Sequence, residues 1–239
     1  MAVLIGSARS DERGKITGGK AGDQNGGKEV STQNWYRHEK GWRVLRCKNP
    51  EKAAKMAEAM RTLCNTNYVG YDQYERNTLY STLKAVGWKL GLLKKNVETD
   101  CSALIRVCCA YAGIALPDFN TSTQAKTMLA SGEFVELTGS KYTESSDYLA
   151  VGDCLITCSK GHTVMVLSDG PKHTAVSVAT GPVVKKGSWN VRKGPGTGYA
   201  SVGIVNGGDR LVAVDTEGWR AIKWDGEIAY ISKNAVEEG

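Results

Sequence analysis

The strongest constraint on the fold is a change of pattern near residue 150 of the 239-residue chain. Before this point, apolar residues recur at helical spacing in several windows. After it, short segments rich in Val, Ile, Leu and Thr are separated by Gly and Asp turns. Helices followed by strands favour an α+β domain with separate layers over an alternating fold with a parallel sheet. The sequence therefore predicts helices packed on an antiparallel sheet.

The predicted helices lie between residues 50 and 130. Pro50 stands at a first helical position behind Asn49 as a cap, and apolar residues follow at helical spacing as far as Leu63. Further helices are expected over about 72–86, 101–112 and 121–130. Residues 1–46 contain glycines that interrupt every period, so we expect loops and short strands there.

The strands define two domains. The first set is expected over residues 153–157, 162–167 and 173–178. A second set of closely spaced short strands, typical of a small barrel, is expected over residues 189–192, 200–205, 210–215, 219–224 and 227–231. We therefore expect an α+β domain over 1–172, a linker over 173–183 and a small all-β domain over 184–239.

The composition excludes several classes of protein. Hydrophobic residues make up 41% and charged residues 23%, as in folded globular chains. No window is long and apolar enough for a membrane span, and the first residues are too short for a signal-peptide core. We therefore expect synthesis in the cytoplasm without an export signal. The seven cysteines are expected to be reduced, and the net charge of +6 favours an anionic partner.

One cysteine, Cys101, stands where a loop becomes an apolar helix. Free backbone N–H groups and the positive end of the helix dipole favour a thiolate there, which is the form that attacks a carbonyl. A buried structural thiol is the alternative, and the flanking Asp100 and Ser102 favour the nucleophile. Cys108 and Cys109 lie further inside the helix and are expected in the core.

A nucleophilic cysteine needs a base, and the chain has three histidines, His38, His162 and His173. His162 follows a glycine at the expected start of a strand, where its ring can face an open edge, so we predict that it is the base. His173 or Asp169 could orient that ring as a third polar group. The alternatives are a structural role for His173 and a hairpin-turn role for Asp169.

A competing interpretation is a zinc site. Cys154, Cys158 and His162 are spaced by four, and His173 could supply a fourth ligand. Along an extended strand, however, four residues cover about 13 Å, which is too far for one metal ion unless the chain bends sharply. We therefore expect neither a metal nor another cofactor.

The residues around Cys101 resemble the NlpC-type branch of papain-like cysteine peptidases, which cleave peptidoglycan. The family signature, Asp-Cys-Ser-Gly-Leu at the start of a helix, reads Asp100-Cys101-Ser102-Ala103-Leu104 here. It is followed in the family order by strand starts at Gly152-Asp153 and Gly161-His162. The chain departs from the family at Ala103, where a glycine is usual, and at Tyr71, which lies further from the cysteine than the family's substrate-side tyrosine.

This resemblance implies a papain-like domain with Cys101 as nucleophile and His162 as base. The third catalytic position of the family is not recognisable in this sequence, and His173 is our candidate for it. The substrate-binding residues that the resemblance implies are Tyr71, Asp100 and Ser102.

The last residues resemble a bacterial SH3-like wall-binding domain. The segment Trp189-Asn190-Val191-Arg192-Lys193-Gly194-Pro195 stands where that family has Leu-Asn-Val-Arg-Ser-Gly-Pro. The resemblance implies a small SH3-like barrel that binds the cell wall, with Tyr199 and Trp219 as candidate contacts.

The two modules together resemble a phage endolysin. This implies a monomeric peptidoglycan hydrolase that acts on the Gram-positive cell wall after release, as an N-acetylmuramoyl-L-alanine amidase or an endopeptidase. One alternative is a catalytically silent wall-binding or structural protein. A nucleic-acid binder is a further alternative, which the diffuse positive charge without a basic aromatic platform disfavours. We expect no membrane partner.

Overall fold

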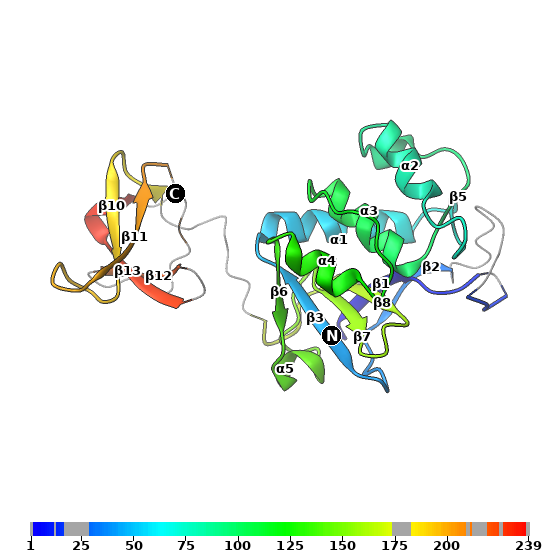
Figure 1. Ribbon diagram of the computed structural model, residues 1–239, viewed down its shortest axis with the longest axis horizontal. Coiled ribbons are helices and arrows are strands. Elements are labelled where there is room, and N and C mark those ends of the chain that lie inside the picture. The colour runs from blue at the N-terminus through cyan, green and yellow to red at the C-terminus, as the bar shows by residue number, and fades with distance from the viewer. Residues whose placement is uncertain are drawn as a thin grey trace. The chain divides into compact units, whose positions relative to one another are not determined.

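We describe the chain from a computed structural model that covers residues 2–11, 13–16, 29–173, 183–208, 211, 219–224 and 227–237. The chain divides into two compact units, Met1–Thr174 and Ala175–Gly239 (Figure 1). Of the linker predicted over residues 173–183, all but His173 and Val183 lie outside the described residues.

The first unit is built on an antiparallel six-stranded sheet with the order β2-β1-β8-β7-β3-β6. Its strands are β1 (Leu4–Ala8), β2 (Val30–Asn34), β3 (Trp42–Cys47), β6 (Phe134–Leu137), β7 (Cys154–Thr157) and β8 (Thr163–Val166). The early strand β1 lies inside the sheet, where Ile5 pairs with Val166 of β8. The short strands expected in the first 46 residues are therefore present, and β1 lies within the sheet rather than at its edge.

Helices cover one face of this sheet, as the α+β pattern predicted. They are α1 (Pro50–Cys64), α2 (Thr78–Ala85), α3 (Cys101–Tyr111) and α4 (Gln124–Ala130). The short α5 (Ser140–Thr143) lies on the opposite face, where Tyr142 packs against a second core. Helices α1 and α3 contact each other and the strands β1 and β8 (Figure 1). The side chain of Asn49 caps α1 by accepting the N–H groups of Glu51 and Lys52. None of the described helices is both long and apolar enough to cross a bilayer.

Helix α2 begins at Thr78, later than the start near residue 72 that helical spacing predicted. The carboxylate of Asp72 accepts the N–H groups of Tyr74 at 2.6 Å and Glu75 at 3.0 Å. Such a side-chain turn competes with helix formation because it satisfies the same backbone donors. The residues before α2 therefore form a turn.

The sheet buries side chains on both faces, with the period of two that strands require. The side chains that join the helix-side core include Leu45, Cys154, Ile156 and Met165. Those in the core on the opposite face include Val44, Leu155, Val164 and Val166. This double burial explains why the segments around residues 155 and 165 are almost continuously apolar.

The Gly-Asp pair before β7 has a structural role. Gly152 has a φ of +86°, and a Cβ there would lie 2.6 Å from the carbonyl oxygen of Ala53 in α1. Asp153 is buried and forms two hydrogen bonds with Arg46 of β3, at 2.8 and 2.7 Å. Its carboxylate also accepts the N–H of Ala150 at 2.8 Å. The pair thus fixes the start of β7 against both α1 and β3.

The second unit consists, in its described part, of strands and one 3-10 turn, Lys233–Ala235. Its strands are β9 (Val183–Val184), β10 (Ser188–Arg192), β11 (Ser201–Asn206), β12 (Trp219–Trp224), β13 (Glu227–Ser232) and β14 (Val236–Glu237). They form an antiparallel sheet ordered β11-β10-β13-β12 and a separate antiparallel pair, β14-β9. The strand expected over 210–215 lies outside the described residues except for Leu211. Among the described strands no ladder closes a barrel, so the SH3-like barrel stays a prediction.

Replacing Arg46 with Met should lower the free energy of unfolding by about 3 kcal/mol or more, because it leaves the Asp153 carboxylate, 1% exposed, without its charged partner. Arg43, also on β3, provides a matched control. It pairs with Glu136 at 2.8 Å, but both side chains are partly exposed, so Arg43→Met should cost about 1 kcal/mol or less. Urea unfolding of the three proteins measures both values. Equal losses would contradict the assigned role of Asp153.

Candidate functional site

The start of α3 is fixed by the side chain of Asp100. Its backbone is extended, with φ −108° and ψ −179°, and its carboxylate accepts the N–H of Ala103 at 2.7 Å. The same oxygen accepts the hydroxyl of Ser102 at 2.8 Å. These bonds place Cys101 at the first position of the helix, as the sequence predicted.

Cys101 is buried at this helix start and is 7% exposed. The backbone N–H groups of Thr163, at the start of β8, and of Ser102 approach its sulfur. Burial, together with the negative charge of Asp100, raises the pKa of the Cys101 thiol to about 12. The helix dipole predicted a thiolate, but the loss of hydration outweighs it, so the resting group is a thiol.

His162 lies immediately before β8 and faces the same pocket. Its backbone N–H donates to the hydroxyl of Thr157 at 3.1 Å, and its ring Nε2 is 3.5 Å from the hydroxyl oxygen of Ser7 on β1. That hydroxyl donates to the carbonyl of Thr163 at 2.8 Å, so it can accept from an Nε2–H. In that tautomer Nδ1 is the basic atom of the ring.

The surroundings keep His162 neutral. Burial, together with the charges of His38 and Arg9, lowers the pKa of its imidazole to about 4. At neutral pH the site therefore holds an uncharged thiol and an uncharged imidazole that can accept a proton.

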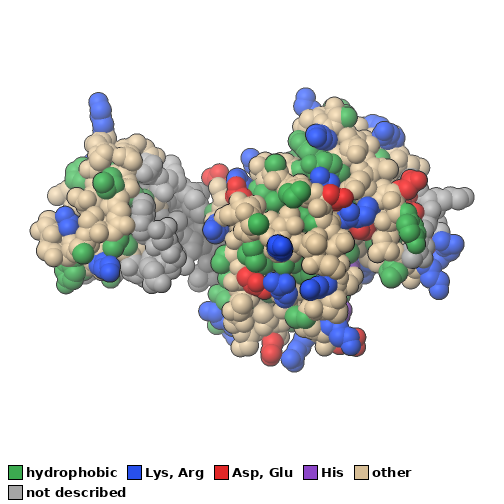
Figure 2. Space-filling view, in the orientation of Figure 1, with side chains coloured by type: hydrophobic (Ala, Val, Ile, Leu, Met, Phe, Trp, Pro, Cys, Tyr) green, Lys and Arg blue, Asp and Glu red, His purple; other side chains and the backbone are tan. Residues whose placement is uncertain are grey.

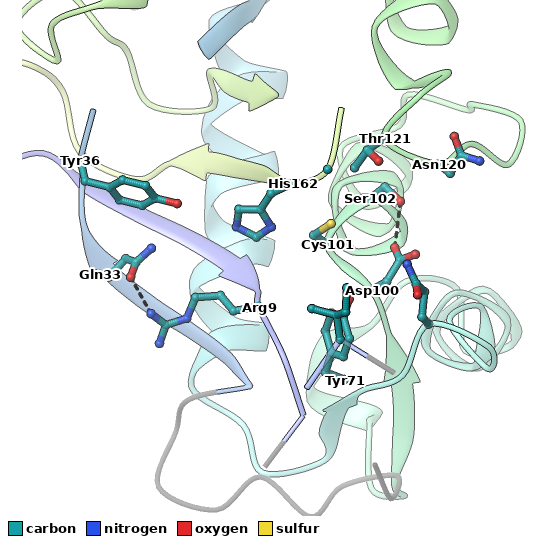
Figure 3. A pocket seen from close by; sticks show the side chains of 13 residues that line it. Arg9, Gln33, Tyr36, Tyr71, Asp100, Cys101, Ser102, Asn120, Thr121 and His162 are labelled. Carbon is teal, nitrogen blue, oxygen red and sulfur yellow. Dashed lines mark hydrogen bonds between the residues drawn. The ribbon is translucent and has the colours of Figure 1, made fainter. Parts of the chain in front are cut away.

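The structure brings five of the predicted site residues to one pocket of about 390 Å³. These are Tyr71, Asp100, Cys101, Ser102 and His162. Figure 3 shows the side chains of Cys101 and His162 directed into it. The other lining residues are Arg9, Ile16, Gln33, Tyr36, Gln73, Asn120, Thr121 and Gly161. The pocket is thus lined by segments far apart in the sequence, from the first 36 residues to the start of β8.

Tyr71 reaches the pocket through a short parallel pair of strands, β4 (Val69–Tyr71) and β5 (Val97–Thr99). In this pair Tyr71 is the partner of Thr99, two residues before Cys101. The strand pairing therefore offsets the long sequence distance that set this chain apart from the family pattern. Burial raises the pKa of the Tyr71 hydroxyl, which stays protonated.

His173 and Asp169 are not brought to the pocket. The ring Nε2 of His173 is 3.9 Å from the Asp169 carboxylate, and its backbone N–H donates to Gly170. Asp169 also accepts the N–H of Val151 at 2.8 Å. Both residues follow β8, whereas His162 precedes it, so they lie at the opposite end of that strand. The polar group that approaches the His162 ring is instead the hydroxyl of Ser7, near Nε2.

The cysteines and histidines of the zinc interpretation are separated. Cys154 packs in the helix-side core, whereas Cys158 is exposed in the turn after β7. Across the part of the chain that the structure describes, no three His, Cys, Asp or Glu side chains are placed to hold a metal ion.

The two aromatic residues proposed for wall contact belong to the second unit. Tyr199 is 51% exposed, and its ring lies so close to Gly194 that a Cβ on that glycine would be 2.4 Å from it. Trp219 begins β12, and its side chain is outside the described part of the structure.

Sequence reasoning missed three polar residues of this region: Ser7, Arg9 and Arg76. Ser7 and Arg9 arrive through the pairing of β1 with β8, and Arg76 binds the side chains of Asp100 and Ser102. No local pattern around any of them marks a site. Ser7 and Arg9 follow an apolar segment, whereas Arg76 lies among other polar residues, where nothing distinguishes it.

A cysteine at a helix start and a histidine at a neighbouring strand start, in one pocket, define a candidate nucleophile and base. A model of the endolysin-like domain family matches residues 5–173, which include the whole pocket. The chain belongs to this family, and the membership indicates a function related to the bacterial cell wall. No curated protein matches the chain.

The low pKa of His162 makes stability depend on pH. Its imidazole titrates near 4 when folded and near 6.5 when unfolded, so the unfolded chain binds more protons between these values. The folded state is therefore destabilised as the pH falls below about 6.5. Between pH 7 and pH 5 the wild type should lose about 2 kcal/mol more stability than His162→Gln. Urea unfolding at both pH values measures the difference, and identical losses would contradict the buried neutral ring.

Proposed function

We propose that the chain is a peptidoglycan hydrolase of the NlpC-type, papain-like branch, with Cys101 as nucleophile and His162 as base. The observation that carries this proposal is the shared pocket of the two side chains, within the segment that matches the endolysin-like domain. The starts of β7 and β8 at Gly152-Asp153 and after Gly161-His162 support the family order of elements.

The neutral state of both groups shapes the mechanism. When an amide of the wall peptide enters, the imidazole of His162 takes the thiol proton while the Cys101 sulfur attacks the carbonyl carbon. The imidazolium then gives this proton to the leaving amine as the C–N bond breaks. Water, deprotonated by the same imidazole, hydrolyses the thioester and restores the thiol. No cofactor takes part in these steps.

The start of α3 also supplies the oxyanion donor. The first N–H groups of a helix have no partner within the helix, and the N–H of Cys101 is among them. Such a donor is directed at the oxygen of the tetrahedral intermediate. In enzymes where an oxyanion donor has been removed by mutation, the activation free energy rises by about 3 to 4 kcal/mol. Position and dipole thus favour the intermediate even though burial disfavours the resting thiolate.

We propose further that residues 184–239 form an SH3-like wall-binding domain, with Tyr199 and Trp219 as contacts. The exposed ring of Tyr199 supports this, because its packing on Gly194 holds one face in place and leaves the rest of the ring available. Val202 and Ile204 of the edge strand β11 are also exposed. Exposed apolar side chains grouped in this way are typical of a binding surface.

Purified Gram-positive cell walls should lose turbidity with the wild type and not with Cys101→Ala, since the thiol forms the covalent intermediate. Cys158→Ala removes the exposed thiol of the same unit and should clear the walls at the wild-type rate. Mass spectrometry of the fragments identifies the bond: free lactyl ends indicate an amidase, and new peptide amino termini an endopeptidase.

Equal clearing by Cys101→Ala and the wild type would exclude Cys101 as nucleophile. Binding to the walls without clearing by either protein would favour the silent wall-binding alternative.

Wall binding should weaken severalfold when Tyr199, which is 51% exposed, is replaced with Ala. The measurement is co-sedimentation of the catalytically inactive Cys101→Ala protein with cell walls, with and without the additional Tyr199→Ala change. Tyr74 of the first unit is 80% exposed, so Tyr74→Ala in the same background controls for the loss of a surface tyrosine. Equal binding of all three proteins would remove Tyr199 from the contact surface.

A further inference from the structure

A single guanidinium, that of Arg76 in the turn before α2, contacts the two residues that flank Cys101. Its Nε donates to the Asp100 carboxylate at 2.5 Å, and its Nη2 donates to the Ser102 hydroxyl at 2.9 Å. The side chain is 16% exposed and that of Asp100 is 7% exposed, so this ion pair is largely shielded from water.

The same guanidinium contacts the loop after α3. Its Nη1 donates to the Asp118 carboxylate at 3.0 Å, and its Nη2 donates to the carbonyl of Phe119 at 2.5 Å. The next two residues, Asn120 and Thr121, line the pocket. Arg76 therefore joins the start of the nucleophile helix to the loop that forms another part of the pocket wall.

These contacts give Asp100 and Ser102 internal partners. One Asp100 oxygen accepts from Ala103 and Ser102, and the other accepts from Arg76. The sequence predicted that Asp100 and Ser102 contact the substrate. The geometry instead supports a structural role, in which both side chains hold the start of α3 and the neighbouring loop in place.

The ion pair also bears on the charge near the sulfur. A carboxylate beside Cys101 opposes formation of a thiolate, and the guanidinium beside that carboxylate counteracts it. Without Arg76, Asp100 would be a buried carboxylate with no cation among the partners described here. Any thiolate that formed on Cys101 would then face its full negative charge.

We propose that Arg76 is a positioning residue of the hydrolase: it holds the Asp100 cap and the loop 118–121 as one unit and compensates the Asp100 charge beside the Cys101 sulfur. The effect on wall hydrolysis rests on the proposed function, whereas the effect on the reactivity of Cys101 is independent of any substrate.

The test is the rate at which iodoacetamide alkylates Cys101 in the full-length protein, followed by mass spectrometry of the peptide that contains it. At a fixed pH of about 9, below the pKa of the thiol, the rate is proportional to the thiolate fraction. Arg76→Met should lower the rate about tenfold, which corresponds to one pKa unit. Arg76→Lys keeps the charge and should recover most of the wild-type rate.

Two further variants separate positioning from general destabilisation. Arg106 is 14% exposed and pairs with the same Asp118 at 3.5 Å, so Arg106→Met tests the loss of a buried arginine from this cluster. It should leave the alkylation rate unchanged. The double variant Arg76→Met/Asp100→Asn removes both charges and should return the rate toward that of the wild type. Because it leaves no unpaired buried charge, it also keeps the test valid if Arg76→Met alone does not fold.

Circular dichroism and thermal unfolding establish that each protein compared is folded. An unchanged alkylation rate in folded Arg76→Met would overturn the proposal. So would an alkylation rate of the double variant that is tenfold below that of the wild type, because removing both charges should restore the rate. Wall clearing is assayed separately with the Cys101→Ala control, so failure of the hydrolase proposal and failure of the Arg76 proposal give different results.

Discussion

The carboxylate of Asp100 holds the candidate site together because it binds the backbone and side chains at once. One oxygen caps α3 through Ala103, and the other pairs with Arg76, which in turn holds the loop 118–121. A buried carboxylate without such partners would cost several kcal/mol. The position of Cys101 and the shape of the pocket beside it therefore depend on the same ion pair.

Local signals in the sequence were sufficient to predict the helix that carries the proposed nucleophile and the helix that packs against it. Asn49 and Asp100 mark helix starts by their capping chemistry, and the structure places α1 and α3 where they predict. Long-range pairing could not be predicted in this way. Ser7 approaches His162 only because β1 lies beside β8, and His173 is kept from the pocket because it follows the same strand that His162 precedes.

The protonation state of the pocket shows where a local argument fails. The helix dipole acts over the first turn of α3 and favours a thiolate, but burial acts on the whole side chain of Cys101 and dominates. A neutral thiol beside the neutral ring of His162 is the combination that burial of both side chains disfavours least. In the proposed reaction, charge separation is postponed until substrate supplies a carbonyl for the sulfur to attack.

The strand order has a consequence for the sequence of folding events during synthesis. In the order β2-β1-β8-β7-β3-β6, strand β8 is the member that joins β2-β1 to β7-β3-β6. It is also the last strand of the sheet to leave the ribosome. Until then a nascent chain holds two separate sheet fragments. The strand that follows His162 completes the sheet, so the pocket forms only after the rest of the first unit has been made.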